Sequence, residues 1–480
     1  MTNTRHDVIV VGGGSAGCVL AARLSEDPAC AVLLLEAGPD YSAAQMPADL
    51  LDGLHGPSGA LHDWGLSGHV GTKDRPLPRG RVIGGCSAVN ATFALRGSPR
   101  DYDAWQQPGW SFAEVLPSFV ALENDLDFGA DEYHGTTGPV PVRRYLGPEQ
   151  SVVAVAASES LRVAGLPAIT DHNAPGAVGV APLPVNAVDG RRMSTALTHL
   201  EPARSRRNLT VRGDAVVHEI ILSDRRAVGV RLVSDEVIYA GEVIVSAGTY
   251  HSPGLLLRSG VDLPGLGANL ADHPAVSVDL PYYGPSCDDG VFQLVATMHS
   301  TMANPATDPP DVQIMVGGPF PLSGPGGTPA FFVAAALLKP LSRGHVGANI
   351  DLNYFDHPHD LARLVEALGR VEDVVVDPAI RTLSRGERLS PRISDDAELR
   401  DWVRANSWSY HHPVGTCAMG TVVDAECRVH GVEGLSVVDA SVMPDIPSAN
   451  TNLPTIMIAE QVVRLRRGTP RRASLSAVHR

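Results

Sequence analysis

The chain has 480 residues, more than one ordinary hydrophobic core accommodates, so we expect two or three domains. Its formal net charge of −15 argues against nucleic acid or an anionic membrane as the main partner, because both favour a cationic surface. The sequence shows no signal peptide, and no apolar stretch reaches the roughly 18 residues of a membrane span, so we expect a cytoplasmic protein.

The N-terminal segment has the order strand, glycine turn, helix, strand and acid. An apolar run from Asp7 leads into the glycines, a helix-compatible stretch follows, and Glu36 ends the next apolar run. Such glycines let the backbone approach a pyrophosphate at a helix N-terminus, and the acid about 20 residues later accepts ribose hydroxyls. The glycines are Gly12, Gly14 and Gly17. We therefore predict a dinucleotide site; Glu36 alone does not separate FAD from NAD.

The six cysteines are scattered along the chain without a CxxC pair or a set of clustered histidines. This spacing favours neither a disulfide framework nor a zinc site. We expect no metal centre.

A second glycine-rich stretch runs from Arg79 to Phe93 and continues in the same spacing to Asp103. The stretch resembles the first signature of the glucose-methanol-choline (GMC) oxidoreductases, with matches at Gly80, Arg81, Gly84, Gly85, Asn90, Ala94, Gly97 and Asp103. Paired glycines let backbone amides approach a flavin and its diphosphate. Val89 stands where some relatives attach the flavin through a histidine, so the resemblance implies non-covalent FAD.

The second family signature matches residues 248–260, which follow an apolar strand and open a helix at Ser252-Pro253. Asp262 replaces the final glycine of this signature. A further family segment matches residues 266–274. We interpret His273 there as a packing or turn histidine and His251 as structural.

Two C-terminal stretches, residues 409–420 and 437–460, carry the predicted chemistry. Oxidation of an alcohol carbon requires removal of the hydroxyl proton, and a neutral imidazole suits that task. By resemblance, His412 is this base. Asn450 matches the second active-site residue of the family, and its amide can donate to the developing alkoxide.

The segment before His412 departs from the family, with Trp408 and His411 at unusual positions. If the segment is extended, Tyr410 shares a face with His412 and His411 points to the other face. A bulky Tyr410 near the flavin would restrict oxygen, which favours a dehydrogenase over an oxidase.

The motifs and the resemblance together define the expected site. The catalytic residues are His412 and Asn450, and the substrate-pocket candidates are Tyr410, Phe93 and Trp408. The cofactor-binding residues are Gly12, Gly14, Ser15, Ala16, Gly17, Glu36, Ala37, Trp64, Arg81, Val82, Gly84, Gly85, Asn90, Ala91, Val217, Ala247, Gly248, Asp439, Ala440, Asn452 and Thr455.

The resemblance implies an α/β fold with two domains. A Rossmann-like FAD-binding domain comprises residues 1–146, 201–274 and 406–470. A substrate-binding α+β domain with an antiparallel sheet comprises residues 147–200 and 275–405. Strands are expected at 311–315, 331–338 and 349–354, a loop at 304–329, and a disordered tail at 471–480.

The expected activity is FAD-dependent oxidation of a primary or secondary alcohol to the carbonyl, with hydride transfer to flavin N5 and reoxidation by O2 or another acceptor. A redox-neutral lyase on the same scaffold is the alternative, and a flavin-binding protein without catalysis is a third. Substrate identity and oligomeric state do not follow from the sequence, because sites rather than folds determine function.

Overall fold

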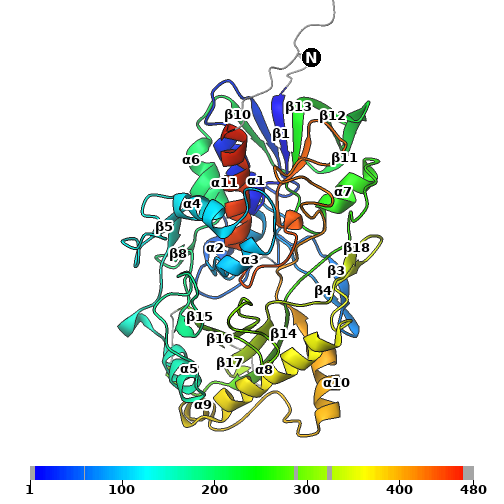
Figure 1. The fold of residues 1–480 in the computed structure, drawn as a ribbon. Coiled ribbons are helices and arrows are strands. Elements are labelled where there is room, and N and C mark those ends of the chain that lie inside the picture. Colours follow the sequence, from blue (N-terminus) through cyan, green and yellow to red (C-terminus); the bar gives the residue numbers. More distant parts are fainter. Residues whose placement is uncertain (1–5, 59, 286–289, 322–326, 469–480) are drawn as a thin grey trace, which may run out of the picture.

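The computed structural model describes residues 6–58, 60–285, 290–321 and 327–468. The tail predicted at 471–480 lies outside the described residues. Two large sheets, toward opposite ends of the view in Figure 1, organise the molecule.

The first sheet has seven strands, in the order β10-β2-β1-β13-β12-β11 with β21 paired to β13. Strands β10, β2, β1, β13 and β21 are mutually parallel, and β12 and β11 extend the sheet antiparallel. The strands are β1 (His6–Val11), β2 (Val32–Leu35), β10 (Leu209–Arg212), β11 (Val217–Ser223), β12 (Arg226–Leu232), β13 (Val237–Val245) and β21 (Leu435–Val437).

Helices α1 (Ser15–Leu24) and α11 (Asn452–Gly468) pack against each other beside this sheet (Figure 1). All four residues of β2 are buried, as in a parallel sheet that is covered on both faces. Parallel strands with crossover helices at the N-terminus confirm the predicted Rossmann-like α/β fold.

The second sheet has six antiparallel strands, in the order β20-β14-β17-β16-β15-β7. The strands are β7 (Val180–Pro182), β14 (Pro274–Pro281), β15 (Phe292–Met298), β16 (Val312–Phe320), β17 (Ala330–Leu337) and β20 (Trp408–Ser409). Alternate side chains of a strand point to opposite faces. One face of β17 packs into a core with α5 (Val152–Val163), α8 (Pro358–Val376) and α9 (Pro378–Ser384), through Phe331, Val333, Ala335 and Leu337. The alternate residues Phe332, Ala334 and Ala336 lie on the opposite face of the sheet, in a separate core.

Smaller elements connect the two sheets. A four-stranded sheet contains β3 (Ser67–Val70), β4 (Lys73–Pro76), β18 (His345–Val346) and β19 (Ile350–Asp351), and two ribbons pair β5 (Glu123–Asp125) with β6 (Val140–Val142) and β8 (Ala187–Val188) with β9 (Arg191–Arg192). The other α-helices among the described residues are α2 (Ala48–Leu51), α3 (Pro99–Asp103), α4 (Phe112–Leu122), α6 (Glu201–Ala203), α7 (Ser252–Arg258) and α10 (Asp396–Asn406).

Two predictions about local structure are wrong. The loop expected over 304–329 is interrupted by β16, which extends to Phe320. The strand expected over 349–354 shrinks to β19, which joins the small four-stranded sheet. The Asp351 carboxylate accepts the N–H of Asn353, which has a φ of 48°, and this side-chain turn ends the strand.

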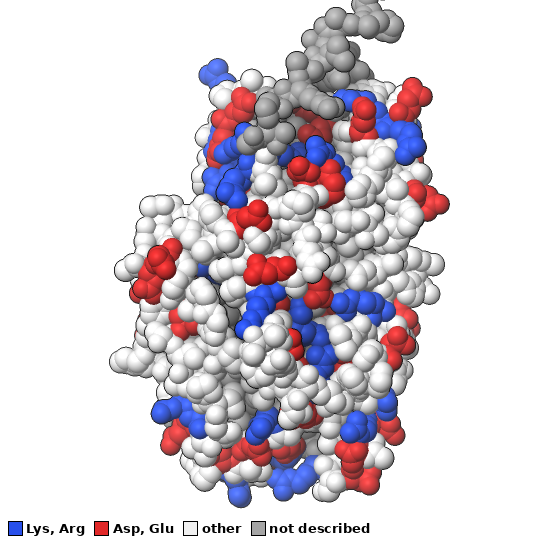
Figure 2. Space-filling view, in the orientation of Figure 1, with Lys and Arg blue, Asp and Glu red and all other residues white. Residues whose placement is uncertain are grey.

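Acidic and basic side chains are interspersed on the face shown in Figure 2, so neither sign forms a continuous patch there. Among the helices in the described part of the chain, none has the length and apolar character needed to cross a membrane.

Candidate active site

The first glycine turn connects β1 to α1 and leaves the start of that helix open. Gly12 has a φ of 99°, and a Cβ there would overlap the carbonyl of Ser246. Gly14 occupies the N-cap position without a side-chain hydrogen bond, so the first amides of α1 remain available. Such a helix end binds anions such as a diphosphate.

Glu36 follows β2 and is held by the glycine turn. Its Oε2 accepts the N–H of Gly13 at 2.7 Å, and its Oε1 accepts the N–H of Gly38 at 2.8 Å. Burial raises the pKa of Glu36 to about 7, although these backbone donors oppose the shift. Each carboxylate oxygen keeps a second lone pair for a ribose hydroxyl.

The second glycine-rich segment packs directly onto the first. A Cβ on Gly85 would lie 2.6 Å from the Cα of Gly14, so the close approach of the two loops requires glycine. Buried Arg192 anchors this segment: Nε donates to the carbonyl of Asn90 and Nη1 to that of Ala88, both at 2.8 Å.

Two further contacts close the glycine loops. Asp439 Oδ2 accepts the N–H of Gly248 at 2.8 Å and the hydroxyl of Ser252 at 2.6 Å. The hydroxyl of Ser15 donates to Asn452 Oδ1 at 2.9 Å, which joins the first turns of α1 and α11. Two helix N-termini therefore meet at the same place.

A cavity of about 600 Å³ runs between these loops and the second sheet. It is lined by the following predicted residues: Gly12, Gly14, Ser15, Ala16, Glu36, Ala37, Trp64, Gly85, Asn90, Ala91, Phe93, Val217, Ala247, Gly248, Trp408, Tyr410, His412, Asp439, Ala440, Asn450, Asn452 and Thr455.

Four predicted residues do not line the cavity. Gly17 packs against the carbonyl of Gly12, and Val82 and Gly84 are buried behind the loops. Arg81 is exposed and places its guanidinium over the Trp64 ring, 5.3 Å from the centroid.

The predicted base lies at the end of the cavity next to the antiparallel sheet. His412 is buried, and its Nε2 lies 3.1 Å from Nδ2 of Asn450. Burial, together with the neighbouring His273, His411 and Arg79, holds the pKa of His412 well below its ordinary value. The imidazole is therefore neutral at pH 7 and able to accept a proton.

The segment before His412 is not extended, so the condition for placing Tyr410 and His411 on opposite faces is not met. Strand β20 ends at Ser409, and His411 has a φ of 65°. This left-handed residue turns the chain, so Tyr410, His411 and His412 all line the cavity. The Tyr410 and His412 rings lie 4.4 Å apart between centroids. Burial lowers the pKa of His411 to about 3, and Arg79 adds to the shift.

The role assigned to His273 is incomplete. Its Nδ1 lies 3.0 Å from Nδ1 of His412, so this residue contacts the base rather than only filling the core. The pair joins residues 139 positions apart, and such long-range contacts leave no signal in a single sequence.

Sequence reasoning also missed an aromatic wall formed by Phe292, Phe320 and Phe332 on the second sheet. The Phe320 and Phe332 rings are stacked with 5.8 Å between centroids, and Phe292 meets Phe93 edge-on at 5.2 Å. The alternation of β17 places Phe332 on the cavity face and Phe331 in the outer core.

Family models of GMC oxidoreductases match residues 6–275 and 338–459. The chain belongs to the GMC oxidoreductase family. Enzymes of this family bind FAD and act on alcohol-type CH-OH donors.

Relatives of known activity cover nearly the whole chain. A 5-(hydroxymethyl)furfural oxidase from a Methylovorus species is 34% identical, covering 96% of this chain and 98% of the relative. An oxygen-dependent choline dehydrogenase from Photobacterium profundum is 33% identical, covering 96% of this chain and 92% of the relative. The crystal structure of pyridoxine 4-oxidase from Mesorbium loti superposes with a TM-score of 0.88 at 29% identity, covering 97% of this chain and 100% of that one.

The residues of this GMC chain fit FAD. The glycine contact between Gly14 and Gly85 leaves a cradle that side chains would fill, and α1 begins without a side-chain cap. Two buried polar atoms on the cavity lining, Asn450 Oδ1 and His251 Nε2, have no hydrogen-bond partner in the described protein.

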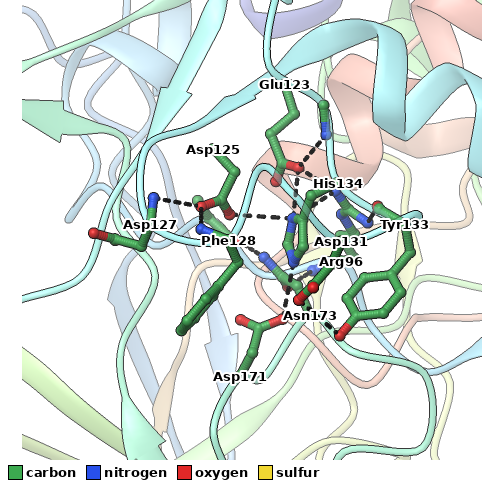
Figure 3. A network of polar contacts seen from close by, with 12 residues as sticks. Arg96, Glu123, Asp125, Asp127, Phe128, Asp131, Tyr133, His134, Asp171 and Asn173 are labelled. Atoms are coloured by element: carbon green, nitrogen blue, oxygen red, sulfur yellow. Dashed lines mark hydrogen bonds and ion pairs between the residues drawn. The ribbon is translucent and has the colours of Figure 1, made fainter.

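A separate group of ionisable residues lies away from this cavity (Figure 3). Glu123, Asp125 and His134 are close enough to suggest a metal site. However, Nδ1 of His134 faces Glu123 at 2.8 Å and Asp125 at 3.1 Å, and Nε2 faces Asp171 at 3.1 Å. Both ring nitrogens point at carboxylates, which is the geometry of an imidazolium donor. Arg96 and Arg144 complete an ion-pair network.

Proposed function

We propose that this protein oxidises the CH-OH carbon of a neutral, flat aromatic or heteroaromatic primary alcohol, with His412 as the general base. Bound FAD supplies the hydride acceptor for this reaction. The observation that carries the proposal is the convergence of the His412 and Asn450 side chains at the aromatic end of the 600 Å³ cavity.

His412 takes the hydroxyl proton as the hydride leaves the carbon. Its burial keeps the imidazole neutral. The lone pair of Nε2 accepts the Asn450 amide until the substrate hydroxyl takes that place. The Asn450 amide beside Nε2 donates to the substrate oxygen, on which negative charge develops. Binding of the alcohol breaks no covalent bond of His412 or Asn450.

We infer non-covalent FAD from Val89. This side chain lines the cavity beside Asn90 and offers no nucleophilic atom. We also propose two domains. The FAD-binding domain comprises residues 1–146, 201–274 and 406–470 and is built around the first sheet. The substrate-binding domain comprises residues 147–200 and 275–405 and is built around the second sheet.

The substrate class follows from the cavity walls. Phe93, Phe292, Phe320 and Phe332 present flat apolar surfaces that suit an aromatic ring. Among the described residues that line the cavity, the carboxylates are Glu36 and Asp439, and both are engaged with backbone amides at the cofactor end. A quaternary ammonium alcohol such as choline would lack a carboxylate partner, and the ring faces alone would have to balance its charge.

We propose O2 as the electron acceptor, supported by the oxidase and oxygen-dependent activities of the relatives. Tyr410, packed against the His412 ring, favours the dehydrogenase alternative. The relatives are redox enzymes, so the lyase alternative is not favoured.

The decisive experiment follows the flavin absorbance of the purified holoenzyme without oxygen. We expect 5-(hydroxymethyl)furfural and benzyl alcohol to bleach the flavin and choline to bleach it far more slowly. Rapid recovery in air would indicate an oxidase, and slow recovery a dehydrogenase. Bound flavin that none of these alcohols bleaches would contradict the proposed substrate class.

His412→Ala should slow flavin reduction by about 10²- to 10⁴-fold, because a positioned general base contributes that much. Flavin content should stay near that of the exposed control His430→Ala, whereas the unfolding midpoint should fall below the control because a buried ring and its two hydrogen bonds are lost. Full turnover in both His412→Ala and Asn450→Ala would refute the mechanism.

A further inference from the structure

His273 lies immediately before β14, buried against the predicted base. Its Nδ1 is 3.0 Å from Nδ1 of His412, and the two rings are nearly perpendicular, at 80°. Asp272 fixes both backbones, since its Oδ1 accepts the N–H of His273 and the N–H of His412, each at 2.8 Å.

Two neutral imidazole nitrogens at this distance form a hydrogen bond, in which one nitrogen carries the proton and the other accepts it. If both carried a proton they would repel, and if neither did, two lone pairs would face each other in a buried space. One ring must therefore donate from Nδ1 while the other accepts at Nδ1.

The surroundings decide which ring donates. Asn450 Nδ2, an amide donor, lies 3.1 Å from Nε2 of His412, so Nε2 is the acceptor nitrogen and the proton sits on Nδ1. His273 then carries its own proton on Nε2. The carbonyl groups of Leu338 and Pro447 face the His273 ring and favour a protonated nitrogen there, although neither reaches hydrogen-bond geometry with Nε2.

We propose that His273 is the positioning residue of the active site: it accepts a hydrogen bond from Nδ1–H of His412 and thereby keeps the lone pair of His412 on Nε2, where it takes the proton of the alcohol. This inference rests on the proposed role of His412. The same hydrogen bond holds the imidazolium that forms when Nε2 is protonated, because a charged donor binds its acceptor more strongly than a neutral one.

The acceptor is neutral, which distinguishes this pair from a base paired with a carboxylate. Burial, then Lys339, lowers the pKa of His273 to about 3, and Asp445 opposes that shift. Arg79 and His411 lie on the His412 side and also disfavour positive charge. The carboxylate of Asp272 is occupied by backbone amides, the Tyr354 hydroxyl at 2.9 Å and the Ser409 hydroxyl.

Three variants separate the function of Nδ1 from the packing of the ring. In His273→Asn the amide oxygen can occupy the place of Nδ1, because both atoms are two bonds from Cβ. His273→Gln moves the amide one carbon further out, toward the place of Nε2, and His273→Leu removes both polar atoms.

We measure flavin reduction of each holoenzyme by 5-(hydroxymethyl)furfural without oxygen. His273→Leu and His273→Gln should lower the limiting rate about 10- to 100-fold, as expected for a lost hydrogen bond to a charged group. The concentration for half-maximal rate and the flavin content should change little. His273→Asn should recover most of the rate, whereas equal losses in all three variants would mean a packing role and overturn the proposal.

A second readout does not depend on any substrate. Proton-coupled ¹⁵N spectra of ¹⁵N-histidine-labelled holoenzyme report the tautomer of each ring, and the signal missing in His412→Ala identifies His412. We expect the Nδ1–H tautomer in the unsubstituted protein and in His273→Asn, and a shift toward Nε2–H in His273→Leu.

The two readouts separate this inference from the proposed function. The expected tautomers together with a flavin that no alcohol bleaches would refute the proposed function and leave the histidine pair as described. Alcohol oxidation with an unchanged His412 tautomer in His273→Leu would overturn the inference and leave the function standing.

Discussion

Tyr410 connects the aromatic end of the cavity to the antiparallel sheet. Its hydroxyl donates to Gln313 Oε1 at 2.8 Å, and its ring packs against His412. Gln313 is fully buried in β16, its Nε2 has no hydrogen-bond partner among the described residues, and it lines a second cavity of about 150 Å³. The Tyr410 hydroxyl thus makes the one side-chain hydrogen bond found for this amide in the described structure.

Tyr410→Phe should lower the free energy of unfolding by about 1–3 kcal/mol, because Gln313 then keeps a buried oxygen without a donor. Guanidinium denaturation of the holoenzyme measures this. Gln313→Leu added to Tyr410→Phe should recover most of the loss, since replacing both partners with apolar groups is nearly neutral. A double variant that is no more stable than Tyr410→Phe would contradict this account.

At the scale of elements, one buried arginine holds the second glycine-rich segment in place. Arg192 in β9 donates to the carbonyls of Ala88, Asn90, Leu50 and Gly56. These carbonyls belong to two chain segments that border the cavity. Burial lowers the pKa of Arg192 to about 10, although the carboxylates of Asp52 and Asp49 oppose the shift.

Arg192→Met should reduce flavin content sharply and lower the free energy of unfolding by about 3 kcal/mol or more, because several buried carbonyls lose their donor together. The ratio of flavin to protein absorbance and guanidinium denaturation measure both effects. Arg191→Met, an exposed neighbour in the same strand, is the matched control and should change neither. Normal flavin content in Arg192→Met would show that the segment does not depend on this residue.

The contrast between these elements shows what the sequence can predict. The turn from β1 to α1 and the acid after β2 are local patterns, so strand, turn and helix follow from glycine spacing and apolar runs. The bond from Arg192 to Ala88 spans 104 residues, and the contact between His273 and His412 spans 139. The hydrophobic periodicity of the sequence does not predict which distant residues form such pairs. These residues come together only when the strands pair into sheets.

At the scale of the whole molecule, the His134 network (Figure 3) joins β5, the loop before β6 and the segment at Asp171. Burial alone would lower the pKa of His134, but hydrogen bonds to Asp171 and Glu123 outweigh this effect and raise it to about 9. Four carboxylates, of Glu123, Asp125, Asp127 and Asp171, surround Arg96, Arg144 and the protonated imidazole.

This ion-pair network predicts a loss of stability in mild base. The raised pKa means that the folded state favours the protonated form, so the contribution is complete below pH 6.5 and is lost as the pH rises through about 9. The shift corresponds to about 3 kcal/mol. The free energy of unfolding, measured by guanidinium between pH 6 and pH 10, should fall accordingly.

His134→Gln serves as the reference, because other groups also titrate in this range. The stability difference between the unsubstituted protein and His134→Gln should be largest near pH 6 and should narrow as the pH approaches 9. A constant difference across the whole range would mean that His134 is not charged in the folded protein.

The bond between Ser15 and Asn452 joins residues 437 positions apart, and Arg23 and Glu460 are bonded across the same interval. During translation, helix α1 leaves the ribosome long before α11 is synthesised. The N-terminus of α1 therefore lacks its α11 partners until nearly the entire chain has been translated. The nucleotide pocket therefore forms late in synthesis. We expect cofactor loading to follow translation of α11, because Asn452 and Thr455 of that helix line the cavity, and ribosome-stalled chains that lack the helix should carry no flavin.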